Sequence, residues 1–333
     1  MTPTTPKQNS NKTALVTGAN SGLGFEAAAQ LAEAGYGKII LACRTIDKAE
    51  GAKKALAERV GSDPYETVAV DVSSVASAEA AGKELVGRGN TIDTVLLNAG
   101  MVSGEQMNKS VDGVELAFAS SIIGHHVLTV RLLEAGMLAD GARVVMSGSE
   151  SARGDLPAMF DMKLYDFVTG TPKEFGDKLD DAMLNFMKGQ GSKKFNPFRH
   201  YATTKVFTSW WTAAMARKFG DRASFFTVSP GSNMSTNAVR HTRGVKKFMF
   251  AKIMPKIGSF FGMDMPVSEG AGRYISVLRD NSGKYQNGAS YMSAPKKMVG
   301  PLQEISPAHF VDVERQETAL RVLGEITGVP AAA

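Results

Sequence analysis

The chain has 333 residues, of which 43% are apolar and 21% charged, and its formal net charge at pH 7 is +5. This length allows one large α/β domain or two smaller ones, and the apolar fraction is enough for a large core. The basic residues are scattered, which argues against a nucleic-acid partner. Since no stretch approaches the ~20 apolar residues that cross a bilayer, we expect no integral membrane segment.

The N-terminal residues and the cysteine content indicate the cellular compartment of the protein. Residues 1–11 are polar, predict a disordered leader and lack the apolar run of a secretory signal peptide. Cys43 is the only cysteine, so no internal disulfide can form, as expected in a reducing compartment. These features predict a cytoplasmic protein.

Short apolar runs alternate with longer helical patterns along the chain. Continuous apolar runs such as Lys38–Cys43 are typical of strands that are covered on both faces. We predict strands at Thr13–Thr17, Lys38–Cys43, Thr67–Val70, Thr94–Leu97, Arg143–Met146 and Ala223–Val228, and helices at Leu23–Ala34, Ala49–Val60, Ala76–Val86, Val114–Leu133 and Ala202–Lys218. This alternation predicts an α/β fold: a single doubly wound, Rossmann-type parallel sheet with helices on both faces, over residues 12–333.

Two long segments interrupt the alternation. The insertion 151–200 is rich in Phe and Met, and the segment 233–266 is basic and also carries Met and Phe. Long segments of this kind are often functional, and both follow strand ends on the ligand-binding side of such sheets. We therefore expect an enlarged substrate-lid region, although Met and Phe are equally typical of a core.

A glycine-rich turn joins the first predicted strand to the first helix. In Thr17–Gly24 (TGANSGLG), Gly18 allows a tight turn, Gly22 a close approach to a diphosphate, and Gly24 close packing of helix on strand. The helix that starts here presents free N–H groups and its positive dipole end to phosphates. The turn thus predicts a dinucleotide site formed by Gly18, Asn20, Ser21, Gly22, Leu23 and Gly24.

The end of the second strand bears on the choice of cofactor. An acidic residue here would bind the ribose 2′-hydroxyl of NAD, but the sequence reads Ala42-Cys43-Arg44. A guanidinium can pair bidentately with a 2′-phosphate, so Arg44 favours NADP(H) over NAD(H). The alternative is that Arg44 only caps its loop. Cys43 is interpreted as a small buried apolar residue.

Tyr201 and Lys205 have the i, i+4 spacing that places two side chains on one helix face. A phenol with a pKa of ~10 is a poor base, and lowering that pKa by ~3 units requires ~4 kcal/mol. An ammonium ~5 Å away at an effective dielectric of ~20 supplies about 3 kcal/mol, and an oxidised nicotinamide ring could supply the rest. The spacing alone also fits a surface Tyr beside a solvated Lys.

Polar or small residues follow several of the other predicted strands. In chain order these are Asp71-Val72, Asn98-Ala99-Gly100, Ser147-Gly148-Ser149 and Pro230-Gly231. Asp71 and Val72 are expected near an adenine, and Ser149 stands where such sheets do chemistry. Together with the glycine turn, they predict one extended site at the carboxyl edge of the sheet.

From Lys12 to about Tyr291 the chain resembles the short-chain dehydrogenase/reductase family, on the motifs TGANSGLG, Asp71-Val72, Asn98-Ala99-Gly100, SGS, YATTK and SPG. The resemblance implies that Tyr201 is the general acid/base, that Lys205 lowers its pKa and holds the nicotinamide ribose, and that Ser149 orients the substrate oxygen. The ACR sequence and the long insertion resemble the NADP-dependent branch with retinol dehydrogenase-like enzymes and light-dependent protochlorophyllide reductases.

Two departures from the family pattern stand out. Ser121 occupies the position where many members carry an asparagine that supports a proton relay, so Ser121 substitutes for it or the relay differs. The cysteines characteristic of protochlorophyllide reductases are missing, since Ser232 follows Pro230-Gly231. His125 and His126 are interpreted as packed or solvated helix residues, and we expect no metal site.

These features predict an NADP(H)-dependent oxidoreductase that transfers hydride between nicotinamide and the carbonyl or alcohol of a bulky apolar substrate. The alternatives are an NADPH-dependent C=C reductase of the protochlorophyllide reductase type and a non-catalytic NADP-binding sensor. The sequence leaves open a monomer or a homodimer.

Overall fold

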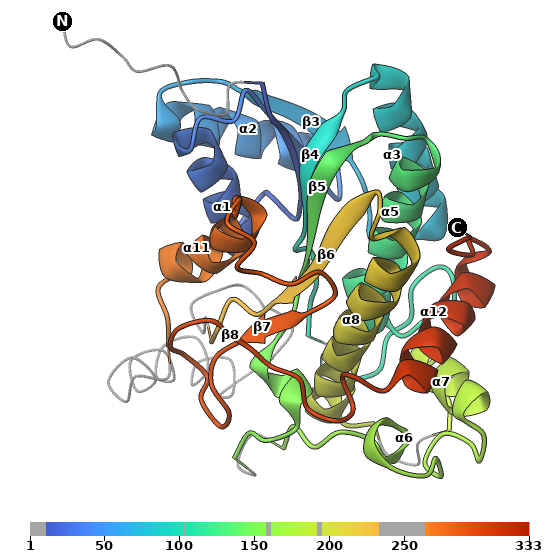
Figure 1. The fold of residues 1–333 in the computed structure, drawn as a ribbon. Helices are drawn as coiled ribbons and strands as arrows, with labels where there is room; N and C mark the ends of the chain where they lie inside the picture. Colours follow the sequence, from blue (N-terminus) through green and yellow to red (C-terminus); the bar gives the residue numbers. More distant parts are fainter. Residues whose placement is uncertain are drawn as a thin grey trace, which may run out of the picture.

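The computed structural model describes residues 11–102, 104, 106–157, 161–191, 195–232 and 264–332. Within them the strands form one sheet in the order β3-β2-β1-β4-β5-β6-β7-β8 (Figure 1). All neighbouring strands are parallel except β7 and β8. The strands are β1 (Thr13–Thr17), β2 (Lys38–Cys43), β3 (Tyr65–Ala69), β4 (Ile92–Leu97), β5 (Leu138–Ser147), β6 (Ala223–Val228), β7 (Ser290–Met292) and β8 (Gln303–Glu304).

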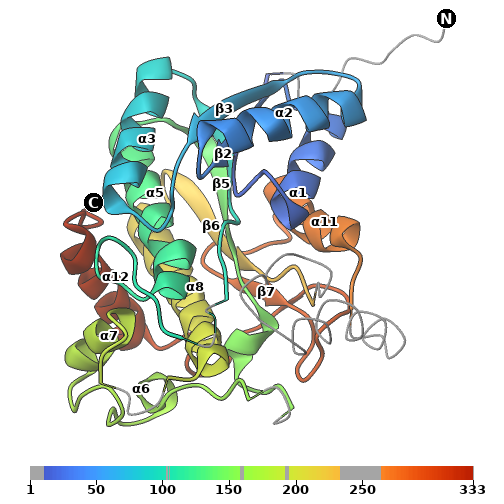
Figure 2. The ribbon, with the colours of Figure 1, turned by 180° about the vertical axis from the view of Figure 1, so that it is seen from behind.

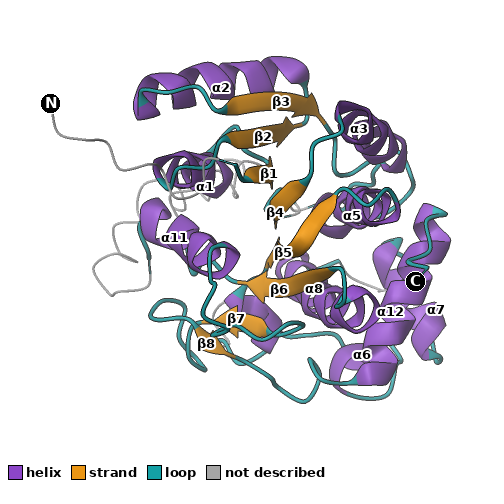
Figure 3. Cartoon of the chain, turned by 45° about the horizontal axis from the view of Figure 1, so that its top comes forward, coloured by secondary structure: helices purple, strands orange, loops and turns teal. Residues whose placement is uncertain are grey.

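Helices cover both faces of this sheet, which confirms the predicted fold class (Figure 3). One face carries α1 (Gly22–Glu33), α2 (Ile46–Val60) and α11 (Val267–Leu278). The other carries α3 (Val75–Arg88), α5 (Gly124–Glu134) and α8 (Pro197–Phe219), and Figure 2 shows them from behind. Shorter or outer helices are α4 (Leu116–Phe118), the π-helical turn η1 (Ala119–Ile123), the 3-10 turn η2 (Glu150–Arg153), α6 (Asp166–Thr169), α7 (Leu179–Met187) and α12 (Val313–Thr327).

The apolar strands are buried on both faces because their side chains alternate between two cores. In β1, Leu15 belongs to the core under α3 and α5, whereas Ala14 and Val16 belong to the core under α1 and α11. The chain runs outward from β1 to β3 and then returns to place β4 on the other side of β1. The connections therefore diverge between β1 and β4, and a crevice forms there at the carboxyl ends of the strands.

The described part of the insertion packs as core. Its aromatic side chains meet in edge-on and stacked pairs with rings of α4 and α8; the cluster comprises Phe118, Tyr165, Phe167, Phe175, Phe186 and Phe207, all buried. These side chains are thus used for packing, the alternative that the sequence left open beside a lid. Met159 and Phe160 lie outside the described residues, as does the predicted lid segment 233–266 apart from its last three residues.

One helical stretch among the described residues, Leu116–Glu134, is long and apolar enough to cross a membrane by length and composition. In this fold 89% of its most apolar window is buried inside the protein. The stretch includes α5, which packs against α3 on one face of the sheet. Its apolar composition is therefore explained by its place in the core.

Candidate active site

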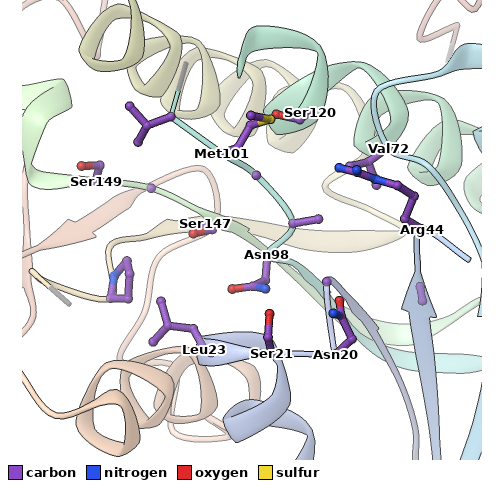
Figure 4. Close-up of a pocket in the computed structure, with 18 of the residues that line it drawn as sticks. Asn20, Ser21, Leu23, Arg44, Val72, Asn98, Met101, Ser120, Ser147 and Ser149 are labelled. Atoms are coloured by element: carbon purple, nitrogen blue, oxygen red, sulfur yellow. The ribbon is translucent and has the colours of Figure 1, made fainter. Parts of the chain in front are cut away.

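A cavity of about 540 Å³ lies at the carboxyl ends of the strands on both sides of the β1–β4 divergence. A volume of this size is typical of ligand and cofactor sites. Figure 4 shows Arg44 and Val72 toward one end and Ser149 toward the other, with Asn20, Ser21 and Asn98 between them. The lining contains the predicted residues Gly18, Asn20, Ser21, Gly22, Leu23, Arg44, Asp71, Val72, Asn98, Ala99, Gly100, Ser149, Tyr201, Lys205, Pro230 and Gly231.

The glycine turn has the backbone geometry that its sequence requires. Gly18 and Gly22 have φ angles of 68° and 57°, a region that L side chains rarely adopt. A Cβ atom on Gly24 would lie 2.4 Å from the carbonyl oxygen of Gly18. Gly24 does not line the cavity. It allows α1 to pack closely against the turn, which is the packing role that the sequence predicted for it.

The end of the cavity near β2 carries two cationic side chains. Arg44 and Lys48 both line it, and Lys48 lies in the first turn of α2, where Thr45 caps the helix. The Arg44 side chain is 61% exposed, and its Nε lies 3.7 Å from Asp71 Oδ2, so it has little to restrain it beyond a weak surface ion pair. A phosphate placed here would meet two cations and the N-terminus of a helix.

Cys43 lies beside this end as a structural residue. Burial raises the pKa of its thiol to about 11, and the backbone N–H groups of Ala19 and Asn20 donate hydrogen bonds to the sulfur. A thiol with such a pKa stays protonated and unreactive at neutral pH. Its interpretation as a small buried residue fits this environment.

The opposite end of the cavity brings together Ser149, Tyr201 and Lys205. Ser149 follows β5, and its hydrogen bond with the Tyr201 phenol lowers the pKa of that phenol. Lys205 Nζ lies 5.7 Å from the centroid of the Tyr201 ring and donates a 2.8 Å hydrogen bond to the carbonyl oxygen of Ser147. The sequence therefore placed all three residues at one site.

One electrostatic expectation is wrong for the protein without cofactor. Burial raises the pKa of Tyr201 to about 12, and the carboxylate of Glu150 opposes the phenolate further. Burial also lowers the pKa of Lys205 to about 8. The ammonium alone therefore does not make the phenol acidic, because loss of solvation disfavours both charged forms in the same place.

Ser121 is a second correction. Ser120 lines the cavity, whereas the Ser121 hydroxyl is buried behind Gly100. A Cβ atom added to Gly100 would lie 3.3 Å from the Ser121 hydroxyl oxygen. Both residues lie in the π-helical turn η1, which changes the direction in which successive side chains point relative to an α-helix. Ser120, labelled in Figure 4, is thus the serine that faces the cavity.

His125 supports the cavity wall from behind. Its Nδ1 lies 2.9 Å from the Ser121 carbonyl oxygen, and its Nε2 lies 3.0 Å from Thr17 Oγ1. The same Thr17 oxygen accepts hydrogen bonds from the backbone N–H groups of Asn98 (2.8 Å) and Ala99 (3.0 Å). A neutral imidazole that donates from Nδ1 and accepts at Nε2 satisfies every group in this chain of contacts.

His126 is also held neutral. Its Nε2 lies 2.7 Å from the Val329 carbonyl oxygen, and its Nδ1 accepts a 3.2 Å hydrogen bond from the indole N–H of Trp211. Burial lowers the pKa of both His125 and His126 to about 4. A proton added to Nδ1 of His126 would break the hydrogen bond that this nitrogen accepts from the indole N–H of Trp211.

These two histidines predict a loss of stability in mild acid. Between the ordinary pKa of 6.5 and about 4 the unfolded chain binds protons that the folded chain does not, so the free energy of unfolding falls as the pH falls through this window. At ~1.36 kcal/mol per pKa unit the loss is about 3 kcal/mol for each histidine. Urea unfolding of His126→Gln at pH 4.5 to 7 should show a smaller loss than the parent chain, in which His309 also contributes because burial lowers its pKa, whereas an unchanged loss would refute this origin.

Sequence reasoning missed several residues of the cavity wall. Lys48 had a visible signal, since it lies four residues after Arg44 at the start of a helix. Ser120 was overlooked because an α-helical register points to its neighbour. The remaining additions are Ala42, Val70, Met101, Val102, Ser147, Gly148 and Ser232.

Comparison with known proteins agrees with this geometry. The family model described as "short chain dehydrogenase" matches residues 12–160. The chain is 27% identical over 296 residues to the chloroplastic protochlorophyllide reductase of Chlamydomonas reinhardtii, covering 85% of this chain and 70% of the relative. It is 25% identical over 283 residues to human retinol dehydrogenase 11, covering 84% of this chain and 78% of that one.

Solved structures share the fold. An uncharacterised protein from Mycobacterium paratuberculosis superposes with a TM-score of 0.68 at 18% identity, covering 97% of this chain and 96% of that one. A Brucella melitensis 3-ketoacyl-(acyl-carrier-protein) reductase complexed with NADH gives a TM-score of 0.55 at 17% identity, over 84% and 95% of the two chains. A short-chain dehydrogenase from Burkholderia cenocepacia in complex with NADP gives 0.57 at 18% identity, over 85% and 96%.

Proposed function

Because the chain belongs to the short-chain dehydrogenase/reductase family and is an oxidoreductase, we propose that it transfers hydride between NADP(H) and the carbonyl or alcohol group of a bulky apolar substrate. The observation that carries the proposal is the shared cavity. Ser149, Tyr201 and Lys205 line the same cavity as the glycine turn and Arg44.

The cavity fits the proposed cofactor. Side chains are missing at Gly18 and Gly22, where a dinucleotide diphosphate requires close approach to the backbone. Arg44 and Lys48 offer two positive charges for a 2′-phosphate, and Cys43 stands where an NAD-specific site would carry a carboxylate. These residues support NADP(H) over NAD(H).

The side chains at the other end divide the work of a carbonyl reduction. When bound, NADPH supplies the hydride, and its oxidised form supplies a positive charge. Tyr201 donates its phenolic proton to the developing alkoxide, and Ser149 stabilises that oxygen by a hydrogen bond. Lys205, whose pKa of about 8 keeps it mostly protonated at neutral pH, stabilises the phenolate that Tyr201 becomes and can hold the nicotinamide ribose. In the alcohol oxidation the proton moves in the opposite direction, from the alcohol to Tyr201.

The cavity wall beside this chemistry supports an apolar substrate. Met101, Val102 and Pro230 line it, with the small Ser232 beyond the Pro-Gly turn. Ser232 also stands where a protochlorophyllide reductase would carry a cysteine, which favours carbonyl chemistry over C=C reduction.

The insertion, the α12 helix and His309 cover the outer side of α8, where Trp210 Nε1 donates to the His309 carbonyl oxygen at 2.6 Å. This covering argues against pairing of two copies of the chain through the outer side of α8.

A matched substrate panel tests the reaction class. Apolar ketones and the corresponding α,β-unsaturated ketones are offered with NADPH, and the products are identified by mass spectrometry and NMR. We expect alcohols from both members of each pair, with the C=C bond retained. Saturated ketones as products would instead assign C=C reduction. Ligand-dependent thermal stabilisation without turnover of any pair would favour a sensor.

A further inference from the structure

The hydroxyl of Ser149 is held by a neighbour two residues along the chain. Its Oγ accepts hydrogen bonds from the Ser151 backbone N–H at 3.3 Å and from the Ser151 hydroxyl at 2.9 Å. A serine oxygen has two acceptor positions and one hydrogen to donate. Since Ser151 fills both acceptor positions, the remaining hydrogen of Ser149 must be donated elsewhere.

Tyr201 is the hydrogen-bonding neighbour of Ser149, and because both acceptor positions of Ser149 are occupied by Ser151, the serine can only be the donor to the phenol. A hydrogen bond donated by Ser149 favours the phenolate form of Tyr201 and so lowers the pKa of the phenol. Ser149 and Tyr201 both line the cavity, so a substrate oxygen that reaches Tyr201 meets the same donor. A serine whose hydrogen pointed at Ser151 would present lone pairs to that oxygen and could not stabilise an alkoxide.

The turn that holds both serines is fixed by a buried ion pair. Glu150 lies between them, and its Oε1 accepts from Arg273 Nη1 at 3.2 Å and from the Ser293 hydroxyl at 2.9 Å. Its Oε2 accepts from the Ser229 hydroxyl, one residue before the Pro-Gly turn. Glu150 and Arg273 are 4% and 7% exposed. Rotation of this turn would leave a buried charge unpaired, which is strongly unfavourable.

We propose that Ser151 is a positioning residue that commits the Ser149 hydroxyl to donating its one hydrogen bond, to Tyr201 before a substrate binds and to the reacting substrate oxygen afterwards. The proposal rests on the proposed function of Ser149 and Tyr201. It assigns to Ser151, which is 2% exposed and outside the cavity wall, a role in the chemistry that acts only through Ser149.

The ionisation of Tyr201 provides a readout. The charged and titratable groups around this phenol are Lys205 from α8, Glu150 from η2, which is itself paired with Arg273, and Tyr274 from α11. Replacing Ser151 by Ala alters none of them. A change in the pKa of Tyr201 in this variant therefore reports the hydrogen bond from Ser149.

Three variants test the proposal: Ser151→Ala, Ser151→Thr and the control Ser209→Ala, which also removes a buried hydroxyl but lies further along α8. Loss of one oriented hydrogen bond predicts that kcat falls roughly five- to tenfold in Ser151→Ala, with KM and NADPH affinity within about twofold. The alkaline pKa of the kcat/KM profile at saturating NADPH should rise, because the phenolate loses a donor. Ser151→Thr should restore both, and Ser209→Ala should change neither.

Two outcomes would overturn the proposal. One is a Ser151→Ala protein with unchanged kcat and unchanged alkaline pKa. The other is equal loss of kcat in Ser151→Ala and Ser151→Thr with no pKa change, which indicates a packing effect. Failure of the proposed function is separate, since it would appear as full turnover in Tyr201→Phe. If no substrate is turned over, an ultraviolet titration of the phenol with bound NADP⁺, referenced to Tyr201→Phe, reads the same pKa.

Discussion

Replacing Tyr201 by Phe is expected to abolish most turnover while leaving cofactor binding nearly intact. The substitution removes one oxygen, which is the proposed proton donor in reduction and base in oxidation. A positioned general acid or base contributes roughly 10²–10⁴-fold, so kcat with the best substrate should fall by about that factor. The ring remains to pack at the start of α8, and NADPH affinity, measured by fluorescence titration, should change by less than about threefold.

The control for this variant is thermal unfolding with and without NADPH. A similar melting temperature and a similar shift on adding NADPH would show that the fold and the cofactor site are retained. Turnover within about threefold of the parent chain would mean that another group transfers the proton. Loss of NADPH binding together with turnover would place Tyr201 in binding alone.

Replacing Arg44 and Lys48 together by Ala is expected to change the cofactor preference. Each cation can form a charge-assisted contact with the 2′-phosphate, and such contacts contribute about 1.5–3 kcal/mol. Arg44 is 61% exposed, so we take the lower part of that range, and the pair should weaken NADPH binding by roughly 10²-fold. NADH affinity should change by less than about threefold, because NADH has no phosphate at this position.

Lys54→Ala is the matched control for this pair, because Lys54 is exposed on the same helix and is absent from the cavity wall. It should leave the ratio of NADPH to NADH affinities unchanged. The single variants should each account for part of the effect. Equal weakening of NADPH and NADH in the double variant would contradict a phosphate-binding role and leave Arg44 as a loop residue paired with Asp71.

The regular part of the fold could be predicted because burial on both faces leaves a clear sequence signal. The predicted bounds of β1, β2 and β6 match the structure, and helix α1 differs only at its ends. In contrast, β5 begins at Leu138, five residues before the predicted start. Asp140-Gly141 is typical of a turn, but here Gly141 has a φ of 74° within the strand, where the pairing with β4 shifts register.

Helix α12 near the C-terminus had local signals that the prediction did not use. Helix α12 begins after Asp312, whose side chain accepts from the backbone N–H of Arg315, and ends at Gly328, which has a φ of 66°. Such a cap and such a terminal glycine are ordinary helix boundaries. The insertion was harder, because aromatic residues that pack together and aromatic residues that line a ligand site have the same composition.

The site was predicted where strand order alone brings residues together. The motifs after β1, β4, β5 and β6 meet at one edge because the strands are parallel. Sequence could not show the π-helical turn that directs Ser120 instead of Ser121 toward the cavity. It also could not show the burial that raises the pKa of Tyr201. Both depend on how η1 and α8 pack, which is a tertiary property.

The central claim is that one cavity holds NADP(H) with its 2′-phosphate at Arg44 and Lys48 and its nicotinamide beside Tyr201. A crystal structure of the complex with NADP⁺ tests this directly. We expect the phosphate within hydrogen-bonding distance of Arg44 or Lys48, and the nicotinamide ribose in contact with Lys205 and Tyr201. A dinucleotide bound elsewhere, or one whose nicotinamide lies away from the Ser149 and Tyr201 hydroxyls, would contradict the account.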